Sequence, residues 1–414
     1  MFTRGVVRRT KMRGVKSQTT DTISFSNVIE SKSGEAIEEA LVTGFYIDEH
    51  WLLGQLPSAN TKITLVAEHR INEQLDDNRV TRIAPQKLKP SVQIMHCKIM
   101  LLFFASHMRF VVSTGSITPE EWSIVQNAVF IQDFKRAKDR LYAANAFSLA
   151  LAYALHDLSV PHAVIGLLNE VKFSNANVHI VTTVPSGTGG NMTEYGAERL
   201  AQVLKEAGVD PENQNLDNIE YFRPNGRLYC VGSSLGPLDN KWLRDMYVCA
   251  HGLSPLKLGW PSIKTLPNNL VDIGVAFHTQ QQVEQCRYGS EVGEKHIYAQ
   301  RKTYEDKKFP HSAMVRLEPA VEDTLVHTKM ILARMGDSQR TGWMYIGSHN
   351  FTPAAWGRLN NKTYYHNNYE FGVILCNVEY SSDNNSVRWD GKEVPLPFKF
   401  IWEPYGRLDA PYLK

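Results

Sequence analysis

The sequence predicts an α/β protein, and three observations carry that prediction. Short apolar runs alternate with helical patterns, no low-complexity linker divides the chain, and one short motif pattern occurs twice. With 43% apolar and 21% charged residues, a chain of 414 residues buries a core without disulfides or structural metals. At roughly 150 residues per domain, the length suggests two or three domains, or one large unit of two parts.

The expected elements follow from the apolar patterns. Runs of strand length bounded by turn residues predict buried strands, and longer periodic stretches predict helices. We expect strands at 99–104, 110–114, 178–183, 330–334, 343–347 and 371–375, and helices at 135–158 and 193–208, with Thr193 as an N-cap. The polar stretch from Phe173 to Asn177 is the expected boundary between an N-terminal domain, 31–173, and a C-terminal domain, 174–414.

The N-terminus is rich in basic residues. Six positive charges precede the first acidic residue, Asp21, and no apolar segment of a secretory signal accompanies them. We expect residues 1–30 to form a flexible basic tail. A nuclear-import patch, a mitochondrial presequence and an arm that touches DNA remain open as its role.

Charge and cysteine content exclude several classes of protein. The net charge is only +2, from 45 Lys+Arg and 43 Asp+Glu, so any site for a polyanion must be local. The five cysteines include no CxxC pair, which argues against a disulfide framework and against a cysteine zinc site. No run approaches the ~20 apolar residues of a membrane span.

The repeated pattern is the most informative feature. The chain reads His96-x-Lys98, an apolar run, then Ser116, and later His327-x-Lys329, an apolar run, then Asn350. Ser116 follows His96 by 20 positions, and Asn350 follows His327 by 23. Because residues i and i+2 of a strand share a face, each copy presents an imidazole and an ammonium together. Two such half-sites related by a pseudo-twofold axis would form one cavity.

These groups suit phosphodiester cleavage without a metal. Lysines and side-chain donors would hold the non-bridging oxygens, one histidine would attack phosphorus, and the other would act as general acid and base. Neither histidine has a second histidine or a carboxylate at a ligand-like spacing beside it, so we expect no metal and no cofactor.

The paired motifs resemble the phospholipase D superfamily. The aspartate that follows the lysine in its lipid-cleaving members is absent here, where Phe103 and Arg334 stand. That variant resembles the tyrosyl-DNA phosphodiesterase family, as do Ser-x-Asn at 348–350, Ala-Ala-Trp-Gly at 354–357, Tyr-Glu-Phe-Gly-Val at 369–373 and Ser-Ser-Leu-Gly at 233–236. The resemblance covers about residues 40–412. It implies a monomer of two similar α-β-α sandwich domains related by a pseudo-twofold axis, with the site at their interface.

The resemblance also implies roles for single residues. His96 matches the nucleophile, His327 the general acid/base, Lys98, Lys329 and Asn350 the groups that hold phosphate, and Glu370 the carboxylate that supports a catalytic histidine. Positions where the family contacts DNA are Ser233, Ser234, Ser348 and Thr352, and Ser116 stands where the first copy usually has Asn. An acidic residue precedes Trp122 as in the family, and here it is Glu121.

The expected substrate is a DNA 3′ end, single-stranded or duplex, blocked by the tyrosine or peptide that topoisomerase I leaves. We therefore expect a nuclear location, with a mitochondrial one as the alternative, and no membrane partner. Two other functions stay open: a lipid phosphodiesterase of the same superfamily, and a weakly active protein that binds DNA ends, which the hydroxyl of Ser116 in place of an amide would allow.

Overall fold

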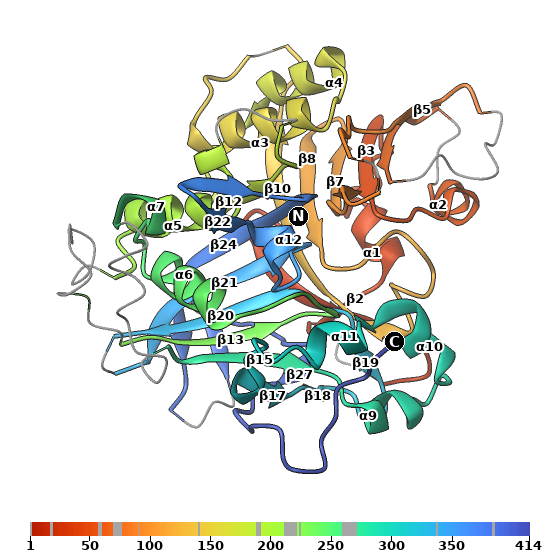
Figure 1. The fold of residues 1–414 in the computed structure, drawn as a ribbon. Helices are drawn as coiled ribbons and strands as arrows, with labels where there is room; N and C mark the ends of the chain where they lie inside the picture. The colour runs from red at the N-terminus through yellow and green to blue at the C-terminus, as the bar shows by residue number, and fades with distance from the viewer. Residues whose placement is uncertain are drawn as a thin grey trace.

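Two large β-sheets with the same strand order form the centre of the molecule. The computed structural model describes residues 2–16, 20–56, 60–68, 77–89, 91–139, 141–187, 192–210, 222, 225–258, 271–336, 338–382 and 386–414. Within these ranges, no helix is both long and apolar enough to cross a membrane. In Figure 1, the central strands of the first half, such as β7 (Ile99–Phe103) and β8 (His107–Ser113), lie toward the upper right, and those of the second half, such as β13 (Arg227–Val231) and β20 (Met330–Met335), toward the lower left.

The first sheet has the order β2-β1-β10-β8-β7-β3-β4-β5, and β11 pairs with β10. Its strands are β1 (Val6–Thr10), β2 (Thr22–Ile23), β3 (Glu39–Gly44), β4 (Lys62–Ala67), β5 (Val80–Ile83), β7 (Ile99–Phe103), β8 (His107–Ser113), β10 (Ala128–Arg136) and β11 (Val171–Lys172).

The second sheet has the order β17-β15-β13-β20-β21-β24-β25-β26, and both β12 and β6 pair with β24. Its strands are β6 (Ile94–Met95), β12 (His179–Thr183), β13 (Arg227–Val231), β15 (Ile273–Phe277), β17 (Met314–Arg316), β20 (Met330–Met335), β21 (Thr341–Gly347), β24 (Asn368–Tyr380), β25 (Val387–Trp389) and β26 (Lys392–Glu393).

The two sheets repeat one topology. The path β1-β10-β8-β7-β3-β4-β5 of the first matches β12-β24-β21-β20-β13-β15-β17 of the second. Neighbours along each path are antiparallel as far as β3 or β13 and parallel beyond it. This agreement is the pseudo-twofold relation that the repeated motif predicts.

Alternation along the central strands explains how the layers pack. In β8, Val112 faces the core between the sheets while Val111 faces the outer helices of the first half. In β21, Ile346 faces the same central core and Tyr345 the outer core of the second half. Both faces of each strand are therefore buried, which is why these segments read as continuous apolar runs.

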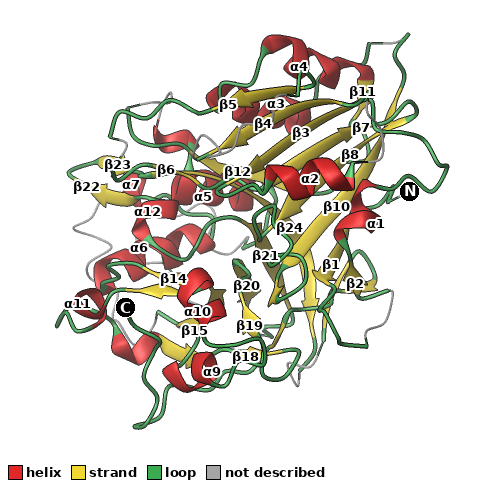
Figure 2. Cartoon of the chain, turned by 90° about the vertical axis from the view of Figure 1, so that its right-hand side faces the viewer, coloured by secondary structure: helices red, strands yellow, loops and turns green. Residues whose placement is uncertain are grey.

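Helices cover the outer faces and one end of the sheets (Figure 2). The first half carries α1 (Phe25–Ile29), α2 (Glu49–Gln55), α3 (Ala146–Asp157) and α4 (His162–Gly166). The second carries α5 (Gly196–Glu206), α6 (Asn240–Ala250), α7 (Pro255–Leu258), α9 (Gln280–Glu284), α10 (Glu291–His296), α11 (Arg301–Tyr304) and α12 (Pro353–Trp356). Short pairs join β9 (Val125–Gln126) to β19 (Leu325–Val326), β14 (Ser234–Leu235) to β16 (Tyr298–Ala299), β18 (Glu318–Pro319) to β27 (Phe398–Lys399) and β22 (Arg358–Asn360) to β23 (Thr363–Tyr365).

The predicted strands are confirmed with small changes at their ends, but two helix boundaries are wrong. The segment from Ala128 to Arg136 is β10, and α3 begins only at Ala146, where the side chain of Asn145 caps it. Lys135 belongs to the sheet because it pairs with His107 and with β11. Helix α5 begins at Gly196, and Thr193 lies in a short 3₁₀ turn before it.

The prediction of a flexible N-terminal tail is also wrong for the part of it that the structure describes. Val6 and Val7 are buried, and β1 pairs antiparallel with β10. Ser24 caps α1, whose Phe25 and Val28 are buried in the outer core. The segment is ordered because its apolar residues, which lie among the positive charges in the sequence, are buried and so hold it in the sheet. The chain passes from the first sheet to the second between β11 and β12.

Candidate active site

Each His-x-Lys motif is held by the opposite half of the molecule. The short strand β6, just before His96, pairs parallel with the start of β24, and β19, just before His327, pairs parallel with β9. The backbone N–H of His96 donates to the carbonyl of Tyr369 at 2.8 Å, and that of His327 to the carbonyl of Gln126 at 2.9 Å. The two histidines are thus fixed at the interface by equivalent bonds.

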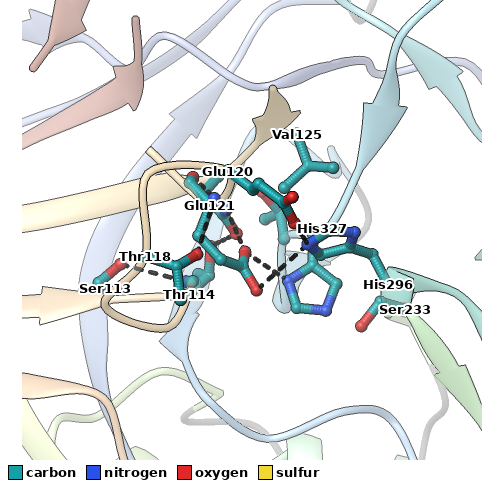
Figure 3. Close-up of polar contacts among 12 residues, drawn as sticks. Ser113, Thr114, Thr118, Glu120, Glu121, Val125, Ser233, His296 and His327 are labelled. Carbon is teal, nitrogen blue, oxygen red and sulfur yellow. Dashed lines mark hydrogen bonds and ion pairs between the residues drawn. The ribbon is translucent and has the colours of Figure 1, made fainter. Parts of the chain in front are cut away.

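The side-chain pairing crosses the interface in the same way. Nδ1 of His96 lies 2.9 Å from Oε2 of Glu370. Nδ1 of His327 lies 2.8 Å from Oε2 of Glu121, and Figure 3 shows this second pair. An ionised carboxylate only accepts hydrogen bonds, so each Nδ1 carries the hydrogen. Nε2 of each neutral ring then keeps its lone pair, as a nucleophile or a general base requires.

Further donors orient both carboxylates. The hydroxyl of Ser348 donates to Oε2 of Glu370, and Nδ2 of Asn368 donates to Oε1 at 2.9 Å. Nδ2 of Asn127 donates to Oε2 of Glu121, also at 2.9 Å. Each carboxylate is therefore held in place by neutral donors besides its histidine.

Both carboxylates are ionised despite being buried. Burial raises the pKa of Glu370, but the charge of His96 and its hydrogen bond oppose this and bring the pKa down to about 2. Burial acts in the same direction on Glu121, and His327, His296 and Lys329 together hold its pKa well below the ordinary value. The two acids are the negative charges that balance the cationic groups of the site.

The histidines of the unliganded site are neutral at pH 7. Burial lowers the pKa of His96, an effect that Glu370 opposes and Lys98 reinforces. Burial likewise lowers the pKa of His327 to about 3, against the charge of Glu121. A neutral His96 with its hydrogen on Nδ1 suits the nucleophile of the first step that the sequence predicts, and a neutral His327 suits the base of the second.

The two lysines are buried side chains that share one electrostatic environment. Nζ of Lys98 donates to the carbonyl of His96 at 2.9 Å, and Nζ of Lys329 donates to the carbonyl of Thr114 at 3.2 Å. Burial lowers the pKa of Lys98 to about 8 and lowers that of Lys329 further, with the charge of Lys98 adding to the effect on Lys329. An anion bound between them would relieve this repulsion, so the site favours a phosphate group.

Asn350 is anchored by the loop that follows β13. Its Oδ1 accepts hydrogen bonds from the backbone N–H groups of Ser233, at 2.9 Å, and Ser234, at 3.1 Å, and from the Ser233 hydroxyl at 3.3 Å. With the carbonyl end occupied, the NH₂ end is the one that can donate to a ligand. The structure thus brings together three of the residues that the sequence selects.

The other selected residues have structural contacts of their own. The Ser348 hydroxyl also accepts from the backbone N–H of Phe371 at 3.0 Å, and the Thr352 hydroxyl caps α12. Ser116 is buried shortly after β8, at the place that Asn350 occupies after β21. Contact of these hydroxyls with DNA stays a prediction.

Three polar residues of the site escape the sequence-based selection of catalytic residues. Glu121 is visible as the acidic residue before Trp122, but nothing in the sequence pairs it with His327, 206 positions away. Asn127 and His296 carry no local signal at all. Among the residues that the structure describes, no group of three or more His, Cys, Asp or Glu side chains is placed to hold a metal ion.

Comparisons with known proteins agree with this geometry. The family model described as tyrosyl-DNA phosphodiesterase matches residues 6–406. Tyrosyl-DNA phosphodiesterase 1 of Arabidopsis thaliana is 25% identical over 466 aligned positions, which cover 95% of this chain and 71% of that protein.

Solved structures of the yeast tyrosyl-DNA phosphodiesterase share the fold. One superposes with a TM-score of 0.73 at 18% identity, covering 99% of this chain and 100% of that chain. A histidine mutant of the yeast enzyme gives the same TM-score at 19% identity, covering 99% of each chain. With two matching sheets, crossed histidine–carboxylate pairs and a family match along nearly its whole length, the chain belongs to the tyrosyl-DNA phosphodiesterase family of phosphodiesterases.

Proposed function

We propose that this phosphodiesterase releases tyrosine or a short peptide from DNA 3′ ends left by topoisomerase I, through a covalent phosphohistidine on His96. The observation that carries the proposal is the pair of crossed contacts, His96 with Glu370 and His327 with Glu121. They leave two Nε2 atoms for one reaction centre that also holds two lysines. The name of the plant relative describes the same class of bond.

In the first step, Nε2 of His96 attacks phosphorus. The bond from phosphorus to the tyrosyl oxygen breaks, and the leaving oxygen takes a proton from Nε2 of His327. The intermediate joins the DNA 3′-phosphoryl group to His96, whose ring becomes cationic. Glu370 stabilises that charge because it already accepts the hydrogen on Nδ1.

In the second step, water replaces the histidine on phosphorus. His327, now neutral, takes a proton from the water, and the bond between phosphorus and His96 breaks. The products are a DNA 3′-phosphate and an enzyme whose His327 carries a proton, as it did before the first step, until the 3′-phosphate leaves. One residue thus serves as acid and then as base, which is economical because both leaving and entering oxygens occupy the same side of phosphorus.

Substrate binding favours the protonated form of His327 that the first step needs, and the proton comes from solvent. In the empty site, burial lowers the pKa of His327 to about 3. A phosphodiester adds a negative charge at the centre that Lys98 and Lys329 border, and this charge favours the protonated ring. Lys98, Lys329 and the NH₂ group of Asn350 are the donors that would hold the non-bridging oxygens.

The proposal extends to the oligomeric state and the cellular location of the protein. All residues of the proposed site come from one chain, which supports a monomer as the active form. A DNA substrate favours the nucleus, and the burial of β1 in the first sheet argues against a cleavable presequence that includes Val6–Thr10.

The direct test is a turnover assay on defined substrates. Purified protein with an oligonucleotide that ends in 3′-phosphotyrosine should release tyrosine and leave a 3′-phosphate, with or without EDTA. A matched oligonucleotide with 5′-phosphotyrosine and phosphatidylcholine vesicles are the controls. Turnover of the lipid alone would establish the lipid phosphodiesterase instead, and binding of the DNA end without release of tyrosine would leave only an end-binding protein.

A further inference from the structure

His296 is a largely buried histidine beside the site, and the mechanism above does not use it. It is the last residue of α10, and its side chain is only 8% exposed. Helix α10 sits close against α9 because Gly293 has no Cβ, which would clash with Val283. The next strand, β16, pairs with β14, so that Tyr298 lies opposite Ser234 beside the Asn350 anchor. The backbone is therefore held in place on both sides of His296, by the packing of α10 and by the pairing of β16.

The ring of His296 faces two carboxylates. Its Nδ1 lies 2.9 Å from the carbonyl oxygen of Val292 and so carries a hydrogen. Its Nε2 lies 3.9 Å from Oε1 of Glu121 and 4.0 Å from Oε2 of Glu120. Figure 3 shows the three side chains together. The His296 and His327 rings are nearly perpendicular, with centroids 5.3 Å apart.

We propose that His296 is a positioning residue for His327 that acts through Glu121, an inference that rests on the proposed function. The two oxygens of Glu121 have separate duties: Oε2 meets the imidazole of His327, and Oε1 faces His296. A positive charge on His296 would attract Oε1, help to keep the carboxylate in place against His327 and keep it ionised.

The surrounding charges are consistent with that role. Glu120 faces the same Nε2 of His296. Glu120 also forms an exposed ion pair with Lys295, whose Nζ lies 3.0 Å from its Oε1. The charge of His296 lowers the pKa of both Glu121 and His327. Lys329 acts on the two in the same direction. His296 thus helps His327 to give up its proton and become the base of the second step.

The loss of His296 should move a measurable titration. Hydrolysis of the covalent intermediate needs neutral His327, so its rate rises with pH through the pKa of that ring. His296→Asn keeps a donor for the Val292 carbonyl but removes the charge that faces Glu121. The rising limb of the pH–rate profile for hydrolysis of the intermediate should then move to higher pH, and steady-state formation of the 3′-phosphate at neutral pH should fall about tenfold, a part of the roughly 10²–10⁴-fold that general acid–base catalysis supplies.

Two further variants separate orientation from charge and from folding. His296→Gln places an amide near Nε2 without a charge, so it should recover part of the rate while the limb stays displaced. His311→Asn is the matched control, because His311 is exposed and likewise contacts a backbone carbonyl, that of Tyr304. It should behave as the wild type.

The position of the limb does not depend on how much protein is active, so it stays informative for a variant that folds less well. A limb and a rate that His296→Asn leaves at their wild-type values would overturn this inference alone. Failure of the wild-type protein to release tyrosine would instead overturn the proposed function and the inference together.

Discussion

Asn127 occupies, in the first half of the molecule, the place that Glu370 occupies in the second. The residue before each one, Gln126 or Tyr369, accepts a hydrogen bond from the backbone N–H of the opposite half's histidine. The residue after each one, Ala128 or Phe371, accepts a hydrogen bond through its carbonyl. The donor is the backbone N–H of the residue that follows β8 or β21, Thr114 or Ser348. An amide therefore stands where symmetry would place a second carboxylate.

A carboxylate from another part of the first half takes the place of the one that symmetry would put at Asn127. Glu121 bonds to Nδ1 of His327, and Asn127 holds Glu121 through its own NH₂ group. The proposed nucleophile, His96, thus has a carboxylate on the central strand β24, whereas the proposed general acid/base, His327, has one on the loop before β9. The two halves therefore share a fold but differ in the residue that supports each histidine, and substitutions can test the two carboxylates separately.

Glu370→Gln should impair the attack of His96 on phosphorus. An amide can present its NH₂ group to Nδ1, which would favour the wrong tautomer and leave the intermediate's charge without a partner. We expect the single-turnover rate of tyrosine release to fall on the order of 10²–10⁴-fold. Glu379→Gln is the matched control on the same strand, at an exposed position far from the site, and its rate should not change.

Glu121→Gln should affect the second step most. Without the carboxylate, His327 is a weaker base, because nothing stabilises the imidazolium that forms when water gives up its proton. The covalent intermediate should therefore persist, and a quenched gel should show DNA bound to protein during turnover. A variant that cleaves slowly without accumulating this species would contradict the assignment of Glu121 to the base.

Ser116 and Asn350 allow a reciprocal exchange at matching positions. Ser116→Asn should be at least as active as the wild type, because an amide adds a second donor and a longer reach toward phosphate. Asn350→Ser should lose the bonds from Ser233 and Ser234 and reduce kcat/KM by roughly 10²-fold or more. A large loss in Ser116→Asn would show that the hydroxyl has another use.

His366 makes stability depend on pH. It is buried, and within the described part of the chain neither ring nitrogen has a hydrogen-bond partner. Burial lowers its pKa from 6.5 to about 4, so between these values the unfolded chain binds a proton that the folded chain does not. The free energy of unfolding should therefore fall by about 3 kcal/mol on this account as pH drops from 6.5 to 4.

Denaturant unfolding at several pH values measures that dependence. His366→Leu should make the slope between pH 6.5 and 4 shallower, whatever the change in stability at pH 8. His311→Leu, at an exposed position, should leave the slope as it is. An unchanged slope in His366→Leu would mean that the ring takes up its proton in the folded protein as readily as in the unfolded chain.

The central strands could be predicted from the sequence because both of their faces are buried. Ile99–Phe103 is apolar throughout, and no other element of that length and composition fits it. The start of α3 could not be predicted, because Lys135 and Arg136 resemble a helix start and their pairing with β11 is a contact between distant segments. For the same reason β1 was hidden, since only its partner β10 distinguishes Val6 and Val7 from a basic tail.

The residues of the site also fall into those that the sequence can identify and those that depend on tertiary contacts. The histidines and lysines could be found because they recur with a spacing that two halves of one fold preserve. The bond between Glu121 and His327 depends on the meeting of β9 with β19. His296 reaches that carboxylate only through the packing of α10 against α9. Contacts of this kind arise from tertiary structure and leave no pattern in the sequence around either residue.

Trapping the covalent intermediate tests the central claim most directly. A His327→Asn variant, incubated with a 3′-phosphotyrosyl oligonucleotide, should release one tyrosine per site and retain the DNA. Digestion and mass spectrometry under conditions that preserve the acid-labile phosphorus–nitrogen bond should place a phosphorylated nucleotide on the peptide that contains His96, and a His96→Ala, His327→Asn double variant should retain none. A nucleotide on any other residue, or release of the 3′-phosphate at the wild-type rate without an adduct, would contradict the account.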